Sequence, residues 1–504
     1  MFQLLKTKNS NAKQEEEKDN KKDKPTPVDF LVYFSLAADK PEDFKNEFGF
    51  DYMRTEYKNI IQTDYEDLKT EYCVCNNIES YVLGKPYYTP WLAMFKDHKK
   101  ITGYEVKLKL HTQKLEETPN DEIDAIQFAC PVGIEMYDEE GNTKIEKLKY
   151  SEINDKIIQI KCTQSFSEHQ YIAVVHAETK HSLGFLNLYK NNPAYRLNVK
   201  FVKVKFKGEV IFKTTDDKGK TTGHINFNND TFNIKQIDPQ GNIFEYPHKM
   251  PDQYTTAQQI KKYTLDTSLN TDLNLSNMIN YIEENAKNTK KYLAQALIQL
   301  DIQPKLEEIK VDVESYDKQK PITMIGLPGI KKIKESIETQ WGKDIQFNYN
   351  QLLLGLQELY SYHKKPDPGI VIFIMPINIV LRCSEKQDAV ILEGYTKTIN
   401  KITKFIMLTK PTAVTQKLPS VLAHQIAHSL GLVPTFQPNE EMDSSTNSSK
   451  HHFYRGTTDN LMDHTSGEED FPKLTSKNKK KDMLWKWQWD IMQQDVQDLT
   501  IIKE

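Results

Sequence analysis

Hydrophobic and polar residues alternate along several stretches in the first half of the chain. The segment YEVKLKLH, residues 104–111, has an apolar residue at every second position, and VKVKFK, residues 202–207, repeats the pattern. A period of two is typical of a strand with one buried face. Two further segments turn through polar clusters at Gly141 and Gly219 and are predicted hairpins. Residues 28–250 are therefore predicted to be rich in antiparallel strands.

The pattern changes after residue 250. Apolar residues between 251 and 303 recur at helical spacing through Leu300, which predicts a helical connector. Beyond this connector, predicted helices alternate with strongly apolar strand segments, GIVIFI at 369–374 and KFIMLT at 404–409. Such alternation of helices and strands is typical of a layered α/β domain.

Length and composition favour several domains. A chain of 504 residues is too long for one ordinary domain and is expected to form roughly three. The first 27 residues are charged and almost without apolar side chains after Leu5, so we expect a disordered, solvated tail. We predict a multidomain α+β protein, whose parts are a disordered charged tail (1–27), a small mixed N-terminal unit (28–95), a β-rich antiparallel domain (96–250), a helical connector (251–303) and a C-terminal α/β domain (304–504).

Charge, cysteine content and hydropathy exclude several classes of protein. A net charge of −4, with both signs spread along the chain, gives no reason to expect a nucleic-acid partner. Five cysteines without zinc-finger spacing argue against a disulfide framework. No run of about eighteen apolar residues predicts a membrane span. The N-terminus lacks the features of a secretory signal peptide, so we expect synthesis in the cytoplasm and export, if any, by a route that reads no such signal.

The segment VLAHQIAHSLGLVPTF, residues 421–436, contains two histidines four residues apart. On a helix, His424 and His428 lie on one face, close enough to bind a single metal ion. The alternative is an ordinary amphipathic helix whose histidines are satisfied by each other or by the backbone. Gly431 follows three residues after His428, where a helix that turns sharply favours glycine. Downstream, Met462 lies within a tight polar turn, and a predicted helix follows it.

This order of parts resembles the metzincin-like zincins, which are zinc peptidases with the motif HExxHxxGxxH followed by a Met-turn. The resemblance covers roughly residues 305–504. It implies a zincin-like fold, with His424 and His428 as zinc ligands, Gly431 as the turn glycine and Met462 as the methionine beneath the metal.

Two positions depart from the family motif. Gln425 stands where the family has the catalytic glutamate, and Pro434 stands where it has the third ligand. A carboxamide cannot accept a proton at neutral pH, so Gln425 is expected to cost at least about a hundredfold in rate. Proline has no donor atom for zinc. Natural loss and deliberate silencing by a Glu-to-Gln change both account for Gln425, and the second departure at Pro434 favours natural loss.

A replacement ligand would have to come from the segment that returns beneath the helix. His464 and His452 are the candidates, and a solvent-facing position in a loop is the alternative for each. Without a third ligand, His424 and His428 would hold zinc weakly, since catalytic zinc sites use three protein ligands.

The first half of the chain carries a second, weaker resemblance. The segments YYTPWLAMFKD (87–97), LGFLNLYKNN (183–192) and LNVKFVKVKF (197–206) resemble the β-rich front half of proteins associated with contractile injection and type VI secretion machinery in Bacteroidota. This resemblance implies a bacterial toxin or effector exported by a contractile injection apparatus.

Together the two resemblances predict a zinc-metallopeptidase-like effector that acts on a protein or peptide and is inactive or impaired because of Gln425 and Pro434. The alternative is a pseudoenzyme without catalytic activity that serves as a binding or structural component of a secretion or injection assembly.

Overall fold

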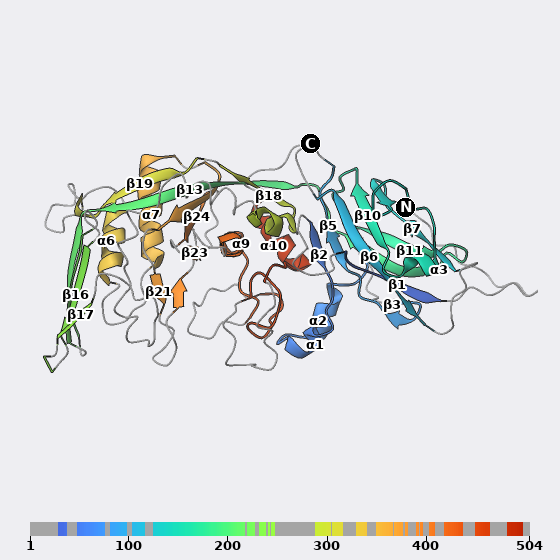
Figure 1. Cartoon of the computed structure of the whole chain (residues 1–504), viewed down its shortest axis with the longest axis horizontal. Coiled ribbons are helices and arrows are strands. Elements are labelled where there is room, and N and C mark those ends of the chain that lie inside the picture. Colours follow the sequence, from blue (N-terminus) through green and yellow to red (C-terminus); the bar gives the residue numbers. More distant parts are fainter. Residues whose placement is uncertain are drawn as a thin grey trace, which may run out of the picture.

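The computed structural model shows a mixed α/β protein in which strands predominate over helices (Figure 1). The predicted mixture of helices and strands is confirmed at this level. The predicted tail at 1–27 and most of the predicted connector, 251–287, lie outside the residues that the structure describes. The described residues are 29–37, 48–75, 81–97, 103–115, 124–216, 219–226, 231–237, 240–241, 243–246, 288–303, 305–315, 329–339, 349–365, 367–375, 379–381, 390–392, 394–396, 403–408, 418–436, 449–463 and 481–496.

Two sheets form a sandwich at one end of the molecule. In spatial order, the first sheet contains β1 (Phe30–Leu36), β6 (Glu105–Lys114), β10 (Ile157–Cys162) and β8 (Ile134–Tyr137). The second contains β2 (Gly49–Asp51), β5 (Trp91–Ala93), β12 (Ser182–Leu188), β11 (Gln170–His176), β7 (Ala125–Ala129) and β9 (Leu148–Lys149). All pairs are antiparallel except β5 with β12. Side chains from both sheets share one apolar core.

The alternating pattern at 104–111 is confirmed by β6. Val106, Leu108 and Leu110 are buried in the core of the sandwich, because successive side chains of a strand point to opposite faces. Strand β6 pairs with β1, and β5 pairs with β12. Each sheet of the sandwich therefore contains strands from both sides of the boundary predicted between residues 95 and 96.

The segment 52–75, which we call the sandwich border, adjoins the sandwich, and short elements complete both. They are α1 (Tyr57–Ile60), α2 (Tyr65–Thr70), α3 (Tyr150–Ile153) and the hairpin of β3 (Tyr81–Val82) and β4 (Lys85–Pro86). Helices α1 and α2 extend from the sandwich toward the middle of the molecule (Figure 1).

A third sheet crosses the middle of the molecule. Its order is β18 (Ile298–Ile302), β13 (Tyr195–Lys207), β20 (Gly369–Ile374), β24 (Thr403–Leu408) and β23 (Gly394–Thr396), with β19 (Glu307–Asp312) beside the second half of β13. All of these pairs are parallel except the edge pair of β23 with β24. A parallel sheet is normally covered on both faces, which explains the unbroken apolar run of β20.

Helices cover both faces of this sheet. Helices α6 (Ile330–Thr339) and α7 (Tyr349–His363) pack on one face with Val371 and Phe373 of β20. On the other face, Ile370 and Ile372 pack in a core that includes α9 (Leu418–Ser429), α10 (Lys486–Val496) and the helical residues 288–294. The result is a three-layer α/β/α arrangement.

This sheet corrects the prediction for the end of the helical connector. Leu300 was assigned to a helix by its spacing, but it lies in strand β18, which pairs with β13. The helical pattern ends because residues 295–297 form a turn, with Leu297 at a φ of +56°. Strand β13 itself comes from the segment predicted to be the β-rich domain. The sheet therefore crosses the boundaries predicted at residues 250 and 303.

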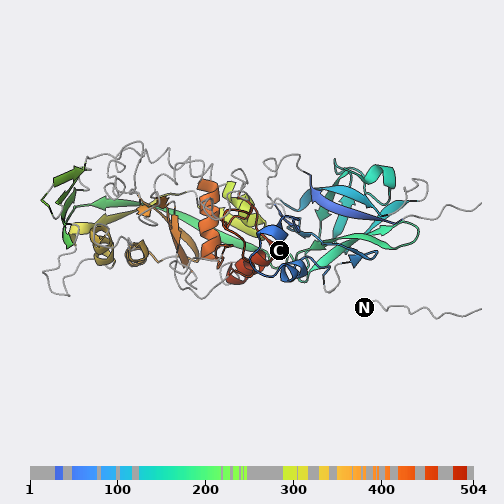
Figure 2. The same cartoon turned by 90° about the horizontal axis from the view of Figure 1, so that it is seen from below.

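A smaller antiparallel sheet projects from the opposite end of the molecule (Figures 1 and 2). It contains β14 (Glu209–Asp216), β15 (Gly219–Asn226), β16 (Thr231–Ile237) and β17 (Ile243–Tyr246). The hairpin predicted at Gly219 is confirmed by the pairing of β14 with β15. Strands β21 (Ile379–Leu381) and β22 (Val390–Leu392) form a separate hairpin, and a 3₁₀ turn, Val313–Ser315, follows β19. Among the described residues, no helix has the length and apolar character that a membrane crossing requires.

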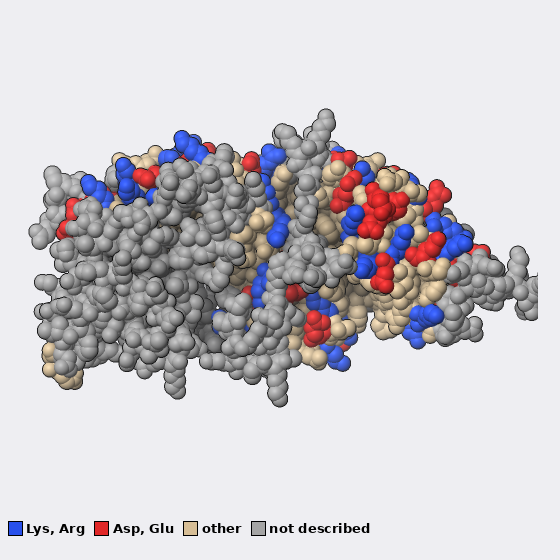
Figure 3. All heavy atoms as spheres, in the orientation of Figure 1, with Lys and Arg blue, Asp and Glu red and all other residues tan. Residues whose placement is uncertain are grey.

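The sandwich and the three-layer region share a continuous apolar core. Tyr189 of the sandwich packs edge-on against Trp489 of α10, with ring centroids 5.4 Å apart, and Tyr57 of α1 packs against Trp485 at 5.6 Å. The border between them is therefore a packed interface. On the face shown in Figure 3, acidic and basic side chains intermingle over the sandwich and do not separate by sign.

Candidate functional site

Helix α9 carries the two histidines and ends in a glycine cap. Its apolar positions, with Leu422 and Ile426 one turn apart, face the core beneath the sheet. At its end, the N–H of Gly431 donates to the carbonyl of His428, and the N–H of Leu432 donates to the carbonyl of Ala427. These two bonds define a Schellman motif, which requires a residue with positive φ, and Gly431 has a φ of +91°. The turn predicted at Gly431 is confirmed.

The two imidazoles lie against each other on one side of α9. Their ring centroids are 4.5 Å apart, and the ring planes are nearly perpendicular, at 89°. Nδ1 of His424 bonds to the carbonyl oxygen of Leu461, and Nδ1 of His428 bonds to the carbonyl oxygen of Leu432, both at 2.8 Å. A carbonyl only accepts hydrogen bonds, so each Nδ1 must carry the proton. In each neutral ring, the lone pair then lies on Nε2, the atom that binds a metal in this tautomer.

The cap of α9 also explains how His428 is oriented. Gly431 turns the chain back on the helix, and this turn places the Leu432 carbonyl beside the ring of His428. A residue of the motif that was predicted only as a turn therefore fixes one of the two imidazoles. His424 is fixed instead by a different segment, the loop of residues 449–463, which we call the Met462 loop.

Hydrogen bonds to two of its own side chains, Asp463 and Asn460, stabilise the Met462 loop. Asp463 accepts hydrogen bonds from the N–H groups of Gly456 and Thr458 and from the Thr458 hydroxyl, each at 2.8 Å. Asn460 accepts from the N–H of Met462 at 2.9 Å and exchanges hydrogen bonds with Gln488 of α10. These bonds fold the tight polar turn that the sequence predicts around Met462.

Met462 is fully buried in the core that also contains α9. Its neighbour Leu461 supplies the carbonyl that bonds to His424, so the methionine turn lies next to the first histidine. The structure thus brings together His424, His428, Gly431 and Met462.

Gln425 is nearly buried, with 8% of its surface exposed, and faces the edge strand β23. A Cβ atom on Gly394 of that strand would lie only 3.0 Å from Cγ of Gln425. Helix α9 and the edge strand β23 therefore lie in close contact at the position of the missing carboxylate.

Pro434 lies in the chain that leaves the cap of α9 and is half-buried. The N–H of the next residue, Thr435, bonds to the carbonyl of Met462 at 3.4 Å. This segment therefore runs beside the Met462 loop, but proline contributes no metal-binding atom there.

The structure accounts for the candidate third ligands as follows. His452 is half-buried, and its main-chain groups bond to Gln62 and Thr63 of the sandwich border. Asp463, which was not one of these candidates, uses its carboxylate to bind its own loop and Lys481. His464 lies outside the described residues. Within the described part of the chain, no group of three His, Cys, Asp or Glu side chains is placed to hold a metal ion. Among the described residues, His424 and His428 thus supply two of the three protein ligands that a catalytic zinc site uses.

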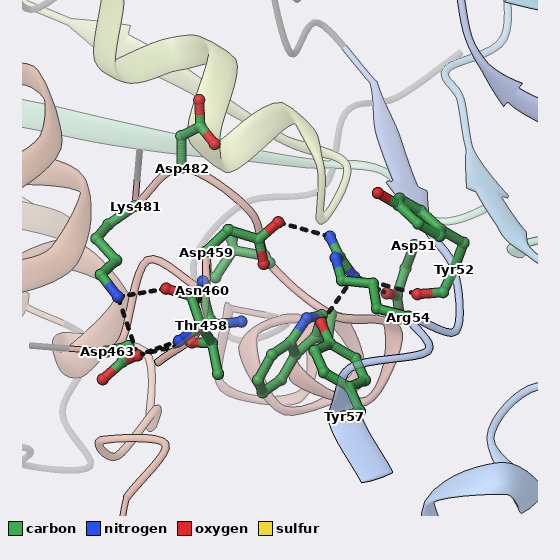
Figure 4. Close-up of polar contacts among 12 residues, drawn as sticks. Asp51, Tyr52, Arg54, Tyr57, Thr458, Asp459, Asn460, Asp463, Lys481 and Asp482 are labelled. Atoms are coloured by element: carbon green, nitrogen blue, oxygen red, sulfur yellow. Dashed lines mark hydrogen bonds and ion pairs between the residues drawn. The ribbon is translucent and has the colours of Figure 1, made fainter. Parts of the chain in front are cut away.

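A buried ionic network, shown in Figure 4, lies where the sandwich border meets the Met462 loop. Nη2 of Arg54 bonds to Oδ2 of Asp459 at 2.9 Å, and Nη1 bonds to the Tyr57 hydroxyl at 2.7 Å. Asp51 lies nearby and accepts hydrogen bonds from Tyr72 and from the N–H of Lys486. Burial raises the pKa of Asp51 to about 7, although Arg54 and these hydrogen bonds oppose the rise.

No local pattern in the sequence indicates this network, because its partners are far apart in the chain. Arg54 and Asp459 are separated by 405 positions. A second ionic contact nearby joins Glu71 to Lys450 and His451. Burial alone would raise the pKa of Glu71, but hydrogen bonds from His451 and Lys450 outweigh it and lower the pKa to about 2.

The site therefore combines a capped helix with two oriented imidazoles, a stapled methionine turn and an ionic network from the first half of the chain. No known protein family matches the sequence, and a search of curated proteins finds no relative.

Proposed function

We propose that the three-layer region is a zincin-like domain and that the chain is a zinc-metallopeptidase-like effector with impaired hydrolytic activity. The observation that carries this proposal is the hydrogen bond of each Nδ1, in His424 and in His428, to a main-chain carbonyl. Metal-binding histidines are typically oriented in this way by a partner on the other ring nitrogen. The same bonds argue against histidines that satisfy only each other. An ordinary amphipathic helix with histidines satisfied by the backbone would show them too, and metal binding separates that alternative from the proposal.

The site has residues that can bind a metal ion, but at position 425 it lacks a residue that can accept a proton. His424 and His428 would hold the ion through Nε2, and a bound zinc ion supplies the Lewis acidity that peptide hydrolysis requires. Gln425 can orient a water molecule by hydrogen bonding, but its carboxamide cannot take up the proton. Slow turnover or none is the expected result for a protein or peptide substrate.

Metal binding by the purified chain tests the proposal. We expect about one zinc ion per chain, bound more weakly than in a three-ligand site, by isothermal titration and by elemental analysis. The variant His424→Ala/His428→Ala should lose it. His111→Ala is a matched control, because it removes a partly exposed imidazole in the sandwich. No binding by the wild-type chain, or equal binding by the double variant, would contradict the proposal.

A pseudoenzyme role is the second candidate, and a specific observation favours it. Gln425 and Pro434 both lack the required chemistry, whereas the cap and the stapled turn around them are intact. A fold that is retained without its catalytic groups suits binding of a protein partner, such as a component of a secretion or injection assembly. This role is supported if the chain binds no metal and Gln425→Glu remains inactive while the protein stays folded.

A further inference from the structure

Arg54 connects the first half of the chain to the Met462 loop. Its side chain is 5% exposed and is held on several sides: its guanidinium stacks over the Tyr52 ring at 4.3 Å, bonds to the Tyr57 hydroxyl and pairs with Asp459. An arginine held by several partners has little freedom to follow a moving loop. It therefore acts as a fixed point against which Asp459 rests (Figure 4).

Asp459 connects Arg54 to the Met462 loop. Its Oδ2 pairs with Arg54, while its Oδ1 is buried and has no hydrogen-bond partner among the described residues. Its main-chain carbonyl accepts hydrogen bonds from the N–H groups of Asp482 and Met483. The Asp459 side chain is therefore held through Arg54, while its backbone is joined to the segment that leads into α10.

Leu461 follows Asp459 by two residues and completes the path to the histidine pair. Its N–H bonds to the carbonyl of Met483, and its own carbonyl accepts the Nδ1 proton of His424. A displacement of Asp459 would move the Leu461 carbonyl and break the hydrogen bond that orients the His424 ring.

We propose that Arg54 is a positioning residue for the His424 imidazole, acting through its ion pair with Asp459 and the Leu461 carbonyl. The sandwich border thereby becomes a working part of a site whose histidines lie in the last hundred residues of the chain. The part of this inference that concerns metal affinity rests on the proposed function. The part that concerns the His424 ring does not.

The first test measures the ring without metal. In chain labelled with ¹⁵N-histidine, we expect wild-type His424 to show the Nδ1–H tautomer with slow proton exchange, and Arg54→Met to show a mixture of tautomers with faster exchange. Arg54→Met leaves the half-buried carboxylate of Asp459 and the buried carboxylate of Asp51, 3.8 Å from Arg54, without their counter-charge, which is destabilising. The triple variant Arg54→Met/Asp51→Asn/Asp459→Asn removes all three charges and preserves the measurement if the single variant does not fold. The variant Asp51→Asn alone shows what the loss of Asp51 contributes.

The second test measures affinity with Co²⁺ as the probe. Loss of the group that is hydrogen-bonded to a metal ligand typically lowers metal affinity by about 10- to 100-fold. Because Arg54 acts on that group, the Leu461 carbonyl, only through Asp459, we expect a loss of up to about 10-fold for the triple variant, which lacks the Arg54 and Asp459 charges, with a changed visible spectrum of bound Co²⁺. Arg54→Lys retains the charge and should recover part of the affinity.

The control is the ion pair of Lys404 with Asp495, which ties β24 to α10. Its side chains are 4% and 22% exposed, against 5% and 24% for Arg54 and Asp459. The double variant Lys404→Met/Asp495→Asn should cost comparable stability but leave both the His424 tautomer and Co²⁺ affinity unchanged.

The outcomes separate this inference from the proposed function. A wild-type chain that binds no Co²⁺, with a His424 ring that still depends on Arg54, contradicts the zinc site and supports the positioning role. A wild-type chain that binds Co²⁺ equally well in all Arg54 variants, with an unchanged His424 tautomer, overturns the positioning role and leaves the zinc site standing. Equal effects in the Lys404 control would also overturn it, since they would reflect stability alone.

Discussion

Gln425 lies beside His424 on α9 and packs against the edge strand β23. A glutamate there would have nearly the same shape and could accept a proton. We therefore expect Gln425→Glu, supplied with zinc, to hydrolyse a peptide substrate about a hundredfold faster than the wild-type chain. Quenched fluorescent peptides measure this rate. Gln425→Ala is the matched control, because it lacks both the amide and the carboxylate, and a gain in this control would rule out proton transfer as the cause.

Asp51 makes the stability of the fold depend on pH. Its pKa is about 7 in the folded chain, against 3.8 as the ordinary value, because burial disfavours the charged form. The folded state thus binds a proton that the unfolded state has already lost. The stability from this group is full below about pH 4 and is lost as the pH rises through about 7, on the order of 4 kcal/mol in total.

The variant Asp51→Asn tests this dependence. Asparagine keeps an oxygen that can accept from Tyr72 or from the N–H of Lys486, but it cannot ionise. Urea unfolding at pH 4.5, 6 and 8 should show a smaller loss of stability with rising pH than in the wild-type chain. Identical slopes for the two proteins would mean that Asp51 does not titrate in this range.

At the scale of the element, the cap of α9 fixes both the end of the helix and the orientation of His428. Gly431→Ala forces a side chain into a φ of +91°, while the nearest atom to its Cβ, in Ile491, would lie at an acceptable 3.4 Å. We expect a loss of about 1–2 kcal/mol from backbone strain, together with loss of the Nδ1–H tautomer of His428. Gly84→Ala, at a φ of +72° with open space around it, is the control. It should cost similar stability and leave His428 unchanged.

The elements that could be predicted are those with a strong local pattern. The period of two in β6 and the glycine that caps α9 were both correct, because burial of one face and a positive φ are decided by neighbouring residues. The prediction of a helix at Leu300 was wrong, because a few apolar residues at helical spacing also fit a strand that is buried on one side. The close approach of Gly394 to Gln425 depends on strand pairing across the fold and leaves no local pattern.

At the scale of the whole molecule, strand β13 decides how the chain can be divided. It pairs with β18 and β19 along one side and with β20 along the other. Its first half packs in the core beneath α9, and Val202, Val204 and Phe206 pack in the core beneath α6 and α7. The alternating pattern at 202–207 predicts a strand, but nothing in that pattern indicates that its partners lie some hundred or more residues downstream.

A chain cut at the boundary predicted from sequence should therefore not fold. The fragment 251–504 contains both histidines and Met462 but lacks β13, so both cores of the three-layer region would be left open and three strands would lose their partner. We expect this fragment alone to be insoluble, or to lack a cooperative thermal transition by circular dichroism. Co-expression with the fragment 1–250 supplies both β13 and Arg54 and should restore a soluble complex. A cooperatively folded 251–504 on its own would mean that the histidine helix does not depend on the first half of the chain, and the role of Arg54 would fall with it.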